Sequence, residues 1–349
     1  MKKNLITTAI ISCAAITSFS AAASGPQFYG RADLALTNAD NQYATNNQKE
    51  GTVLENNFSW LGVKGTEKVN EHVEIIYQME FGVTNFDNSG NTFSARNSFV
   101  GAKTDYGTVV VGRNDTVFKA SEGGVDLFGN TNSDIDRMAA GQNREADGVT
   151  YYSPKIADLI TLNATYLMDD NHVDADGNSK SDDTMYAVSA TLGDRALRAQ
   201  NYYFAAAYQD GIGDIEAFRA VGQAKFGDVI VGAMYQNSES TDEKLSHIKG
   251  DTFFVNAAYV IGDWKLKAMY GQDDSGLGHY AKRFANDNGA HEDMTDFDLK
   301  QFSVGADYKL SKNAMLYGHY TKYDGDMTLE TVKHDISDDI FTVGLRLNF

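Results

Sequence analysis

The last ten residues constrain the fold more than any other stretch, because apolar and polar or small side chains alternate along them. The two sets are Phe341, Val343, Leu345, Leu347 and Phe349 on one parity, and Thr342, Gly344, Arg346 and Asn348 on the other. Successive side chains of a β-strand point to opposite faces, so this segment has one apolar wall and one polar wall. In a soluble sheet the apolar wall packs on a core. In a transmembrane barrel it meets lipid, and the polar wall lines the lumen.

The same alternation returns along almost the whole chain, and short turns such as Gly227-Asp228 separate some of the segments. Long polar loops, such as 273–296 and 324–337, separate others. About sixteen segments share the pattern: 27–36, 53–65, 73–81, 94–103, 108–114, 148–153, 159–168, 185–192, 201–209, 217–226, 229–235, 253–261, 264–270, 302–308, 314–323 and 340–349. This predicts an all-β fold, a transmembrane antiparallel β-barrel of about sixteen strands. Such a barrel must close, because an open edge in hydrocarbon leaves peptide groups unpaired.

The first 23 residues have the anatomy of a secretory signal peptide. Lys2 and Lys3 precede an apolar run, and small residues end at Ala23. We therefore expect residues 1–23 to be cleaved and residues 24–349 to form one exported barrel domain. The only cysteine, Cys13, lies in the leader. The expected mature chain then has no thiol for disulfides, metal binding or nucleophilic catalysis.

The charge of the chain excludes some partners and favours others. The net charge is −18, and it becomes −20 when Lys2 and Lys3 are removed. Such a chain repels nucleic acid and concentrates cations in any water that it encloses.

Motifs for catalysis and for metal binding are missing from the sequence. It contains no HExxH, Walker or GxGxxG motif, and none of its seven histidines has a clear nucleophile setting such as G-x-S-x-G. The acidic run 174–182 lacks the glycine placement and the terminal glutamate of an EF-hand, so a solvated loop is the favoured interpretation. We expect no enzymatic activity, no cofactor and no dedicated metal site.

Several short motifs resemble those of the general Gram-negative porins, the family that includes the OmpC, OmpU and OmpF types. They are Phe28-Tyr-Gly-Arg-Ala-Asp-Leu, Leu61-Gly-Val-Lys-Gly65, Phe99-Val-Gly-Ala-Lys103, Val111-Gly-Arg-Asn114, Leu310-Ser-Lys-Asn and the terminal Phe349. The resemblance extends over the expected mature chain. It implies a barrel in the cell outer membrane, usually a homotrimer, in contact with the lipid bilayer and lipopolysaccharide. Phe349 is then the terminus used by the outer-membrane assembly machinery.

The resemblance also implies a constriction, formed by a third outer loop folded into the lumen. Residues 115–146 occupy the place of that loop, and Val125-Asp126-Leu127 matches its acidic segment. Asp126 is therefore the leading constriction carboxylate, and Arg31 and Arg96 match basic positions on the opposite wall. Trp60 and Tyr152 stand where the family commonly has further arginines. The remaining candidates are the loop acids Asp115, Glu122 and Asp134 and the lumen residues Trp60, Lys64, Glu80, Tyr152 and Arg346.

The expected function is an outer-membrane porin, a water-filled channel for passive diffusion of small hydrophilic solutes and ions with a weak preference for cations. Two alternatives remain open. One is a substrate-specific channel with a lumen binding site, to which Arg219, Lys225, Lys265 and Lys267 could contribute. The other is an added role of the exposed loops as an adhesin or phage receptor. Arg31 and Arg96 could also simply pair with lumen acids, and Trp60 could be an interface anchor.

Overall fold

The computed structural model describes residues 25–84, 86, 90–172 and 184–349. The expected signal peptide and the acidic run 174–182 lie outside these residues. The strands are β1 (Gln27–Ala39), β2 (Gly51–Asn56), β3 (Trp60–Lys68), β4 (Val73–Val83), β5 (Phe93–Thr104), β6 (Gly107–Asp115), β7 (Arg144–Tyr152), β8 (Ile160–Leu167), β9 (Tyr186–Gly193), β10 (Tyr202–Asp210), β11 (Ile215–Phe226), β12 (Val229–Ser240), β13 (Lys249–Ile261), β14 (Trp264–Asp273), β15 (Met294–Lys309), β16 (Ala314–Leu329) and β17 (Val332–Asn348).

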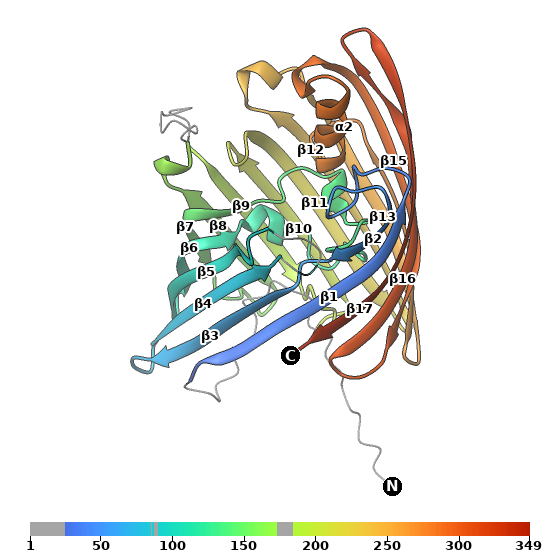
Figure 1. The fold of residues 1–349 in the computed structure, drawn as a ribbon. Helices are drawn as coiled ribbons and strands as arrows, with labels where there is room; N and C mark the ends of the chain where they lie inside the picture. The colour runs from blue at the N-terminus through green and yellow to red at the C-terminus, as the bar shows by residue number, and fades with distance from the viewer. Residues whose placement is uncertain (1–24, 85, 87–89, 173–183) are drawn as a thin grey trace.

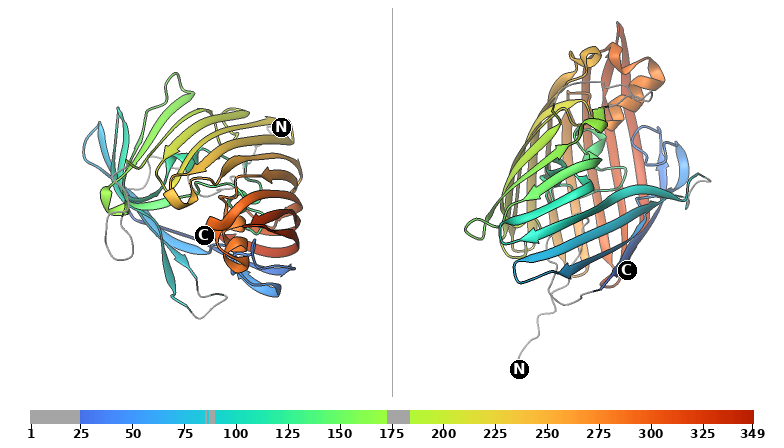
Figure 2. Two further views of the ribbon diagram at one scale, coloured as in Figure 1. Left: turned by 90° about the horizontal axis from the view of Figure 1, so that it is seen from above. Right: turned by 90° about the vertical axis from the view of Figure 1, so that its left-hand side faces the viewer.

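These strands form one antiparallel sheet that closes into a barrel (Figures 1 and 2). Its seventeen strands occupy sixteen barrel positions, because β2 and β3 both pair with β1. The sequence predicted one strand over 53–65. The break at Asn57–Ser59 arises where Phe58 takes a positive φ of 59° and the Asn57 amide donates to Asp33 O. The predicted sixteen-stranded barrel is confirmed.

The first and last strands make the closing seam. β1 and β17 pair from Arg31↔Asn348 to Ala39↔Ile340. Next to the first of these pairs, Gly30 and Phe349 exchange two backbone hydrogen bonds of 2.9 and 3.0 Å. The sheet therefore has no unpaired edge where β1 and β17 lie side by side.

The two faces of each strand differ as the alternation predicted. On β17, Val343, Leu345 and Leu347 are exposed on the outside, whereas Thr342 faces inward and is 1% exposed. On β13, Val255 and Tyr259 are exposed outside, and their neighbours point into the barrel. An apolar exterior and a largely polar interior result. Among the described residues no helix is long and apolar enough to cross a membrane.

The barrel wall has unequal height, and this overturns the expected loop at 324–337. The strands β15 to β17 rise well above the others (Figure 1). β16 and β17 are joined by a two-residue turn in which Glu330 has a φ of 53°. The inward side chains there, such as Tyr323 and Ile336, are apolar and buried, while the outward ones are polar. In this part of the hairpin the outward side chains are polar because they face water and not lipid. These polar residues are the reason why the sequence predicts a loop here.

The expected loop 273–296 contains ordered helices. They are α2 (His279–Asn288) and the 3-10 helix η4 (His291–Asp293). The buried residues of α2 lie on one side: Tyr280, Ala281, Phe284 and Ala285. Two other short 3-10 helices are η2 (Asp169–His172) and η3 (Glu243–Leu245). Connections at the rim where α2 lies also differ in length, because β10 and β11 are joined there by only 211–214.

Candidate pore constriction

Residues 116–143, here called the β6–β7 segment, connect two neighbouring strands and contain the short helices α1 (Val117–Ala120) and η1 (Ile135–Arg137). The segment packs against inward-facing side chains of the wall. Phe118, Val125 and Phe128 are buried in one cluster with Met234 and Phe254 of that wall. Its helix α1 contacts β8 to β10, and Val117 N donates to Thr165 on β8. The apolar side of the segment therefore faces the strands β8 to β16.

The opposite wall carries charged residues that are paired with one another. Arg96 on β5 and Glu80 on β4 form an ion pair of 2.6 Å. The Tyr29 hydroxyl on β1 also donates to Glu80, at 3.1 Å. Both candidates thus face inward, but each neutralises the other.

Asp115 ends β6 and is the centre of a second paired group. Its Oδ1 atom lies 3.0 Å from Arg144 Nε and 3.4 Å from Lys119 Nζ. Its other oxygen accepts from Asn97 Nδ2 at 3.3 Å. The carboxylate therefore holds together the two ends of the β6–β7 segment. Arg144 and Lys119 lie within the stretch 115–146, and the sequence alone gives no sign that they pair with Asp115.

Cations and aromatic rings alternate on β1 and β3. Lys64 Nζ lies 4.9 Å from the centre of the Tyr29 ring, Tyr29 packs edge-on against Trp60 at 5.1 Å, and Arg31 Cζ lies 5.8 Å from the centre of the Trp60 ring. Arg31 Nε also donates to Asn348 Oδ1 at 3.0 Å. Trp60 is 7% exposed and inward-facing. Its alternative placement as a lipid-interface anchor is therefore wrong.

Arg346 forms an ion pair with Asp33 across the closing seam. The Tyr317 hydroxyl donates to the other oxygen of Asp33 at 2.7 Å. Asp33 is fully buried and was absent from the candidate residues. Its parity with Arg31 in the sequence signalled that it faces inward, but nothing indicated that Arg346 would be its partner.

The carboxyl groups of Asp126 and Asp134 accept hydrogen bonds from backbone amides of their own segment. Asp126 Oδ1 accepts from Phe128 N at 2.9 Å, and Asp134 accepts from the amides of Asp136 and Asn130. Burial and the neighbouring charge of Asp136 raise the pKa of Asp134 to about 7. Burial and the charge of Asp134 likewise raise the pKa of Asp126.

Asp136 behaves in the opposite way. Burial alone would raise its pKa, but the charges of Arg137, at 3.0 Å, and of His279 hold it below the usual value. Glu122 is partly buried, and burial raises its pKa although Arg219 and Lys119 oppose this. Tyr152 lies on the inner face of β7, where its hydroxyl accepts from Asn114 at 2.9 Å. The carboxylates of the segment are therefore not equivalent.

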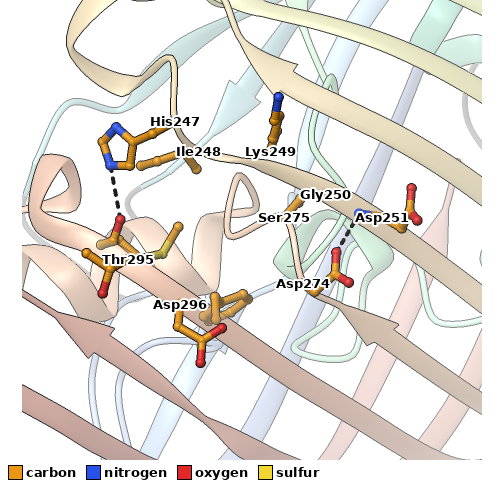
Figure 3. Close-up of a pocket in the computed structure, with 11 residues that line it drawn as sticks. His247, Ile248, Lys249, Gly250, Asp251, Asp274, Ser275, Thr295 and Asp296 are labelled. Atoms are coloured by element: carbon orange, nitrogen blue, oxygen red, sulfur yellow. Dashed lines mark hydrogen bonds between the residues drawn. The ribbon is translucent and has the colours of Figure 1, made fainter.

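A separate hollow lies at the rim, away from these residues. It has a volume of about 320 Å³, and its lining includes His247, Lys249, Asp251, Asp274 and Asp296 (Figure 3). The Asp251 amide donates to Asp274 at 2.5 Å. None of the predicted constriction residues lines it. Within the described part of the chain, no group of three or more metal-binding side chains is placed to hold an ion.

A closed barrel with an apolar exterior and a lumen lined by charged residues defines a channel protein of the outer-membrane type. The chain belongs to the Gram-negative porin family, whose model matches residues 7–328. It is an outer-membrane channel for passive diffusion. No curated protein sequence matches the chain.

Solved structures of porins share the fold at low sequence identity. The anion-selective porin from Comamonas acidovorans is 18% identical with a TM-score of 0.69, over 93% of this chain and 99% of that one. Salmonella typhi OmpF in complex with daunomycin is 16% identical with a TM-score of 0.67, over 93% and 97%. OmpT of Vibrio cholerae in its trimer form is 17% identical with a TM-score of 0.64, over 93% and 99%.

Proposed function

We propose that the β6–β7 segment narrows the channel and that the channel weakly prefers cations. The observation that supports a narrowing is the asymmetric packing of the segment, whose apolar side lies against β8 to β16. This leaves the inner face of β1 and β3 to β7 to line the passage. Solutes then move between the polar side of the segment and a wall that carries Arg31, Lys64, Glu80, Arg96 and Tyr152.

The preference for cations is expected to be weak because many of the lumen charges cancel in pairs. Glu80 pairs with Arg96, and Asp33 pairs with Arg346. The excess of acid lies instead at the strand ends and connections of the rim from which β16 and β17 rise, at Asp210, Asp214, Glu216, Glu239, Asp242 and Glu243. Carboxylates at a channel mouth raise the local concentration of cations.

The zero-current potential in a KCl gradient tests this proposal. Wild type is expected to give the cation-selective sign. Asp115→Asn removes the partner of Arg144 and Lys119, so it should move the potential towards the anion-selective sign. Asp228→Asn makes the same charge change at an exposed turn and should leave the potential near that of wild type. An anion-selective wild-type channel, or equal shifts in both variants, would contradict the proposal.

A substrate-specific channel finds less support in the structure. Arg219 is fully buried against the β6–β7 segment, and Lys267 is paired with Asp307 at 2.7 Å. Lys267 also lies 4.5 Å from the centre of the Phe128 ring. Together with Lys265 and Lys225 these residues do not form an open track of cations. We therefore expect the current to show no saturation, and no block, as the concentration of a small hydrophilic solute is raised.

We also infer that the protein has no enzymatic activity and forms a homotrimer in contact with outer-membrane lipid, lipopolysaccharide and, during insertion, the assembly machinery. The trimer rests on family membership and on the OmpT structure described as a trimer form. Chemical cross-linking in detergent should give a species of three subunits. A monomer at all protein concentrations would contradict it.

A further inference from the structure

Arg219 is an arginine of the barrel wall that is fully buried. It lies on β11, faces inward and is 0% exposed. Among the described residues no carboxylate comes within ion-pair distance of it. A buried cation without an ion pair is costly, so its hydrogen-bond partners, together with the nearby charge of Glu122, must compensate for the lost water.

Those partners lie near the two ends of the β6–β7 segment. Arg219 Nη1 donates to Phe118 O at 3.4 Å, and Nη2 donates to Ala140 O at 3.0 Å. The guanidinium group also stacks on the Phe118 ring, with Cζ 4.3 Å from the ring centre. One side chain of the wall therefore joins residues that are far apart along the segment.

Gln236 on β12 supports this arrangement from the next strand. Its Oε1 accepts from Arg219 Nε at 2.8 Å, and its Nε2 donates to Ala140 O at 3.2 Å. Gln236 therefore fixes the orientation of the Arg219 guanidinium group through its Nε atom. A planar group with several donors suits such a double contact, whereas a lysine ammonium does not.

Arg195, between β9 and β10, donates through Nη2 to Gly123 O at 3.2 Å. Four further donors to the middle of the segment are neutral, and each reaches one of its backbone carbonyls. They are Gln223 to Gly124 at 2.6 Å, Asn256 to Val125 at 2.5 Å, Gln301 to Ser133 at 2.8 Å and Tyr323 to Asn132 at 2.8 Å. Arg219 differs from the four neutral donors because it carries charge, and the two carbonyls that it contacts lie near opposite ends of the segment. Hydrogen bonds to charged groups are also the stronger kind.

We propose that Arg219 is the positioning residue that holds both ends of the β6–β7 segment on the wall and thereby keeps the width of the passage constant. This inference rests on the proposed role of the segment as the constriction. Loss of the guanidinium group leaves the buried Phe118 carbonyl without this donor. The segment then exchanges among positions, and the current through the open channel becomes unsteady.

Single-channel recording of Arg219→Met tests the inference. The time spent below the main conductance level should rise by roughly tenfold or more, since loss of charged hydrogen bonds shifts an equilibrium by at least that factor. Arg219→Lys keeps the charge but not the planar double contact, so its effect should be intermediate. Arg198→Met, at an exposed position between β9 and β10, is the matched control and should record as wild type.

A reversible disulfide between the β6–β7 segment and the wall tests whether Arg219 positions the segment or only stabilises the barrel. The hydroxyls of Ser133 and Thr321 contact each other, so cysteines at these positions can join the segment to β16. Cys13→Ser removes the one native cysteine. In Arg219→Met, the oxidised Ser133→Cys/Thr321→Cys pair should restore a steady current, and a reductant should abolish the rescue on the same channel.

The outcomes distinguish the inference from the proposed function. Steady wild-type-like current in Arg219→Met, or unsteady current that persists when the tether is oxidised, overturns the role of Arg219. Absence of conductance from folded wild-type protein overturns the channel itself. If Arg219→Met fails to insert, Arg219→Lys carries the test, and a current as steady as that of wild type then overturns the inference.

Discussion

Two carboxyl groups of the β6–β7 segment show how local structure changes the role of a residue. Asp126 and Asp134 are close enough for a side-chain hydrogen bond, and both accept from amides of their own segment. Burial and mutual repulsion favour the protonated form of such a pair. At neutral pH these residues therefore contribute less negative charge to the passage than their number suggests.

The selectivity of the channel should consequently depend on pH. The pKa of Asp134 is raised to about 7, so this group gains its negative charge as the pH rises through that value. The preference for cations should be larger at high pH than at low pH, and Asp134→Asn should remove part of the change. Zero-current potentials on both sides of neutrality measure this, and a preference that falls with rising pH would contradict it.

The same raised pKa fixes a sign for stability. The fold favours the protonated carboxyl, so the destabilising contribution of Asp134 grows as the pH rises from 3.8 to about 7 and is constant above that. Asp134→Asn should therefore raise the unfolding temperature of the protein at high pH more than at low pH. A larger gain at low pH would show that the carboxylate is stabilised in the fold.

The sequence identified most inward-facing residues, because parity alone assigns a side chain to a face. Arg31, Lys64, Glu80, Arg96 and Arg346 lie where the alternation and the family motifs placed them. Parity does not determine which of these residues pair with one another across neighbouring strands. The pairing of Asp33 with Arg346 joins the two ends of the chain, and only the register of β1 against β17 determines it.

The seam between β1 and β17 leaves no room for a side chain at position 30, which is occupied by Gly30. A Cβ atom there would lie 2.5 Å from the Phe349 ring and 2.9 Å from the backbone oxygen of Trp60. Gly30→Val should therefore destabilise the closed barrel by about 1–3 kcal/mol. The temperature at which the folded gel band converts to the unfolded one measures the effect.

Gly25→Val provides the matched control for that substitution. A Cβ atom at Gly25 meets nothing within 4 Å. Its conversion temperature should equal that of wild type. Equal temperatures for Gly30→Val and wild type would mean that the seam can relax around the added side chain.

The helix α2 joins two connections at the rim. Phe284 packs edge-on against Tyr43 at 5.0 Å, and Arg283 donates to Tyr43 O and Thr45 O at 2.8 and 3.0 Å. Phe284→Ala should weaken this contact by about 3–5 kcal/mol, which is typical for a buried aromatic ring.

Limited proteolysis measures that local effect. Cleavage within 279–288 should be faster in Phe284→Ala, while the conversion temperature of the barrel stays unchanged. Tyr106→Ala removes an aromatic ring that is 85% exposed and serves as the control. Unchanged cleavage would show that the helix does not depend on this packing.

Element boundaries were predictable only where lipid faces the barrel. There the apolar parity marks each strand. The ends of β11 to β14 at the short turns 227–228 and 262–263 agree with the sequence analysis, whereas β12, β13 and β14 extend three to five residues further at their other ends. Above that level water replaces lipid, so the upper parts of β15 to β17 lose the outward apolar signal. The apolar residues of α2 follow a helical period that the strand-based interpretation of 273–296 did not consider.

At the scale of the whole molecule, one cylinder separates lipid outside from water inside. The adjacent residues Tyr151 and Tyr152 represent the two faces: Tyr151 is exposed outside at 38%, and Tyr152 bonds to Asn114 inside. Charged residues follow the same division, because they point into the lumen, where Glu80 pairs with Arg96 and Asp33 pairs with Arg346, or gather at the rim. The fold therefore explains both passive conduction and the weak preference proposed for cations.

Thiol modification of single channels tests this division most directly. In a Cys13→Ser background, Tyr152→Cys and Tyr151→Cys place one thiol on either face, and a charged, membrane-impermeant thiol reagent is added during recording. Wild-type-like steps that shrink on modification of Tyr152→Cys, with no change for Tyr151→Cys, are the predicted result. A folded, inserted barrel without conductance, or equal reduction in both variants, would contradict the account.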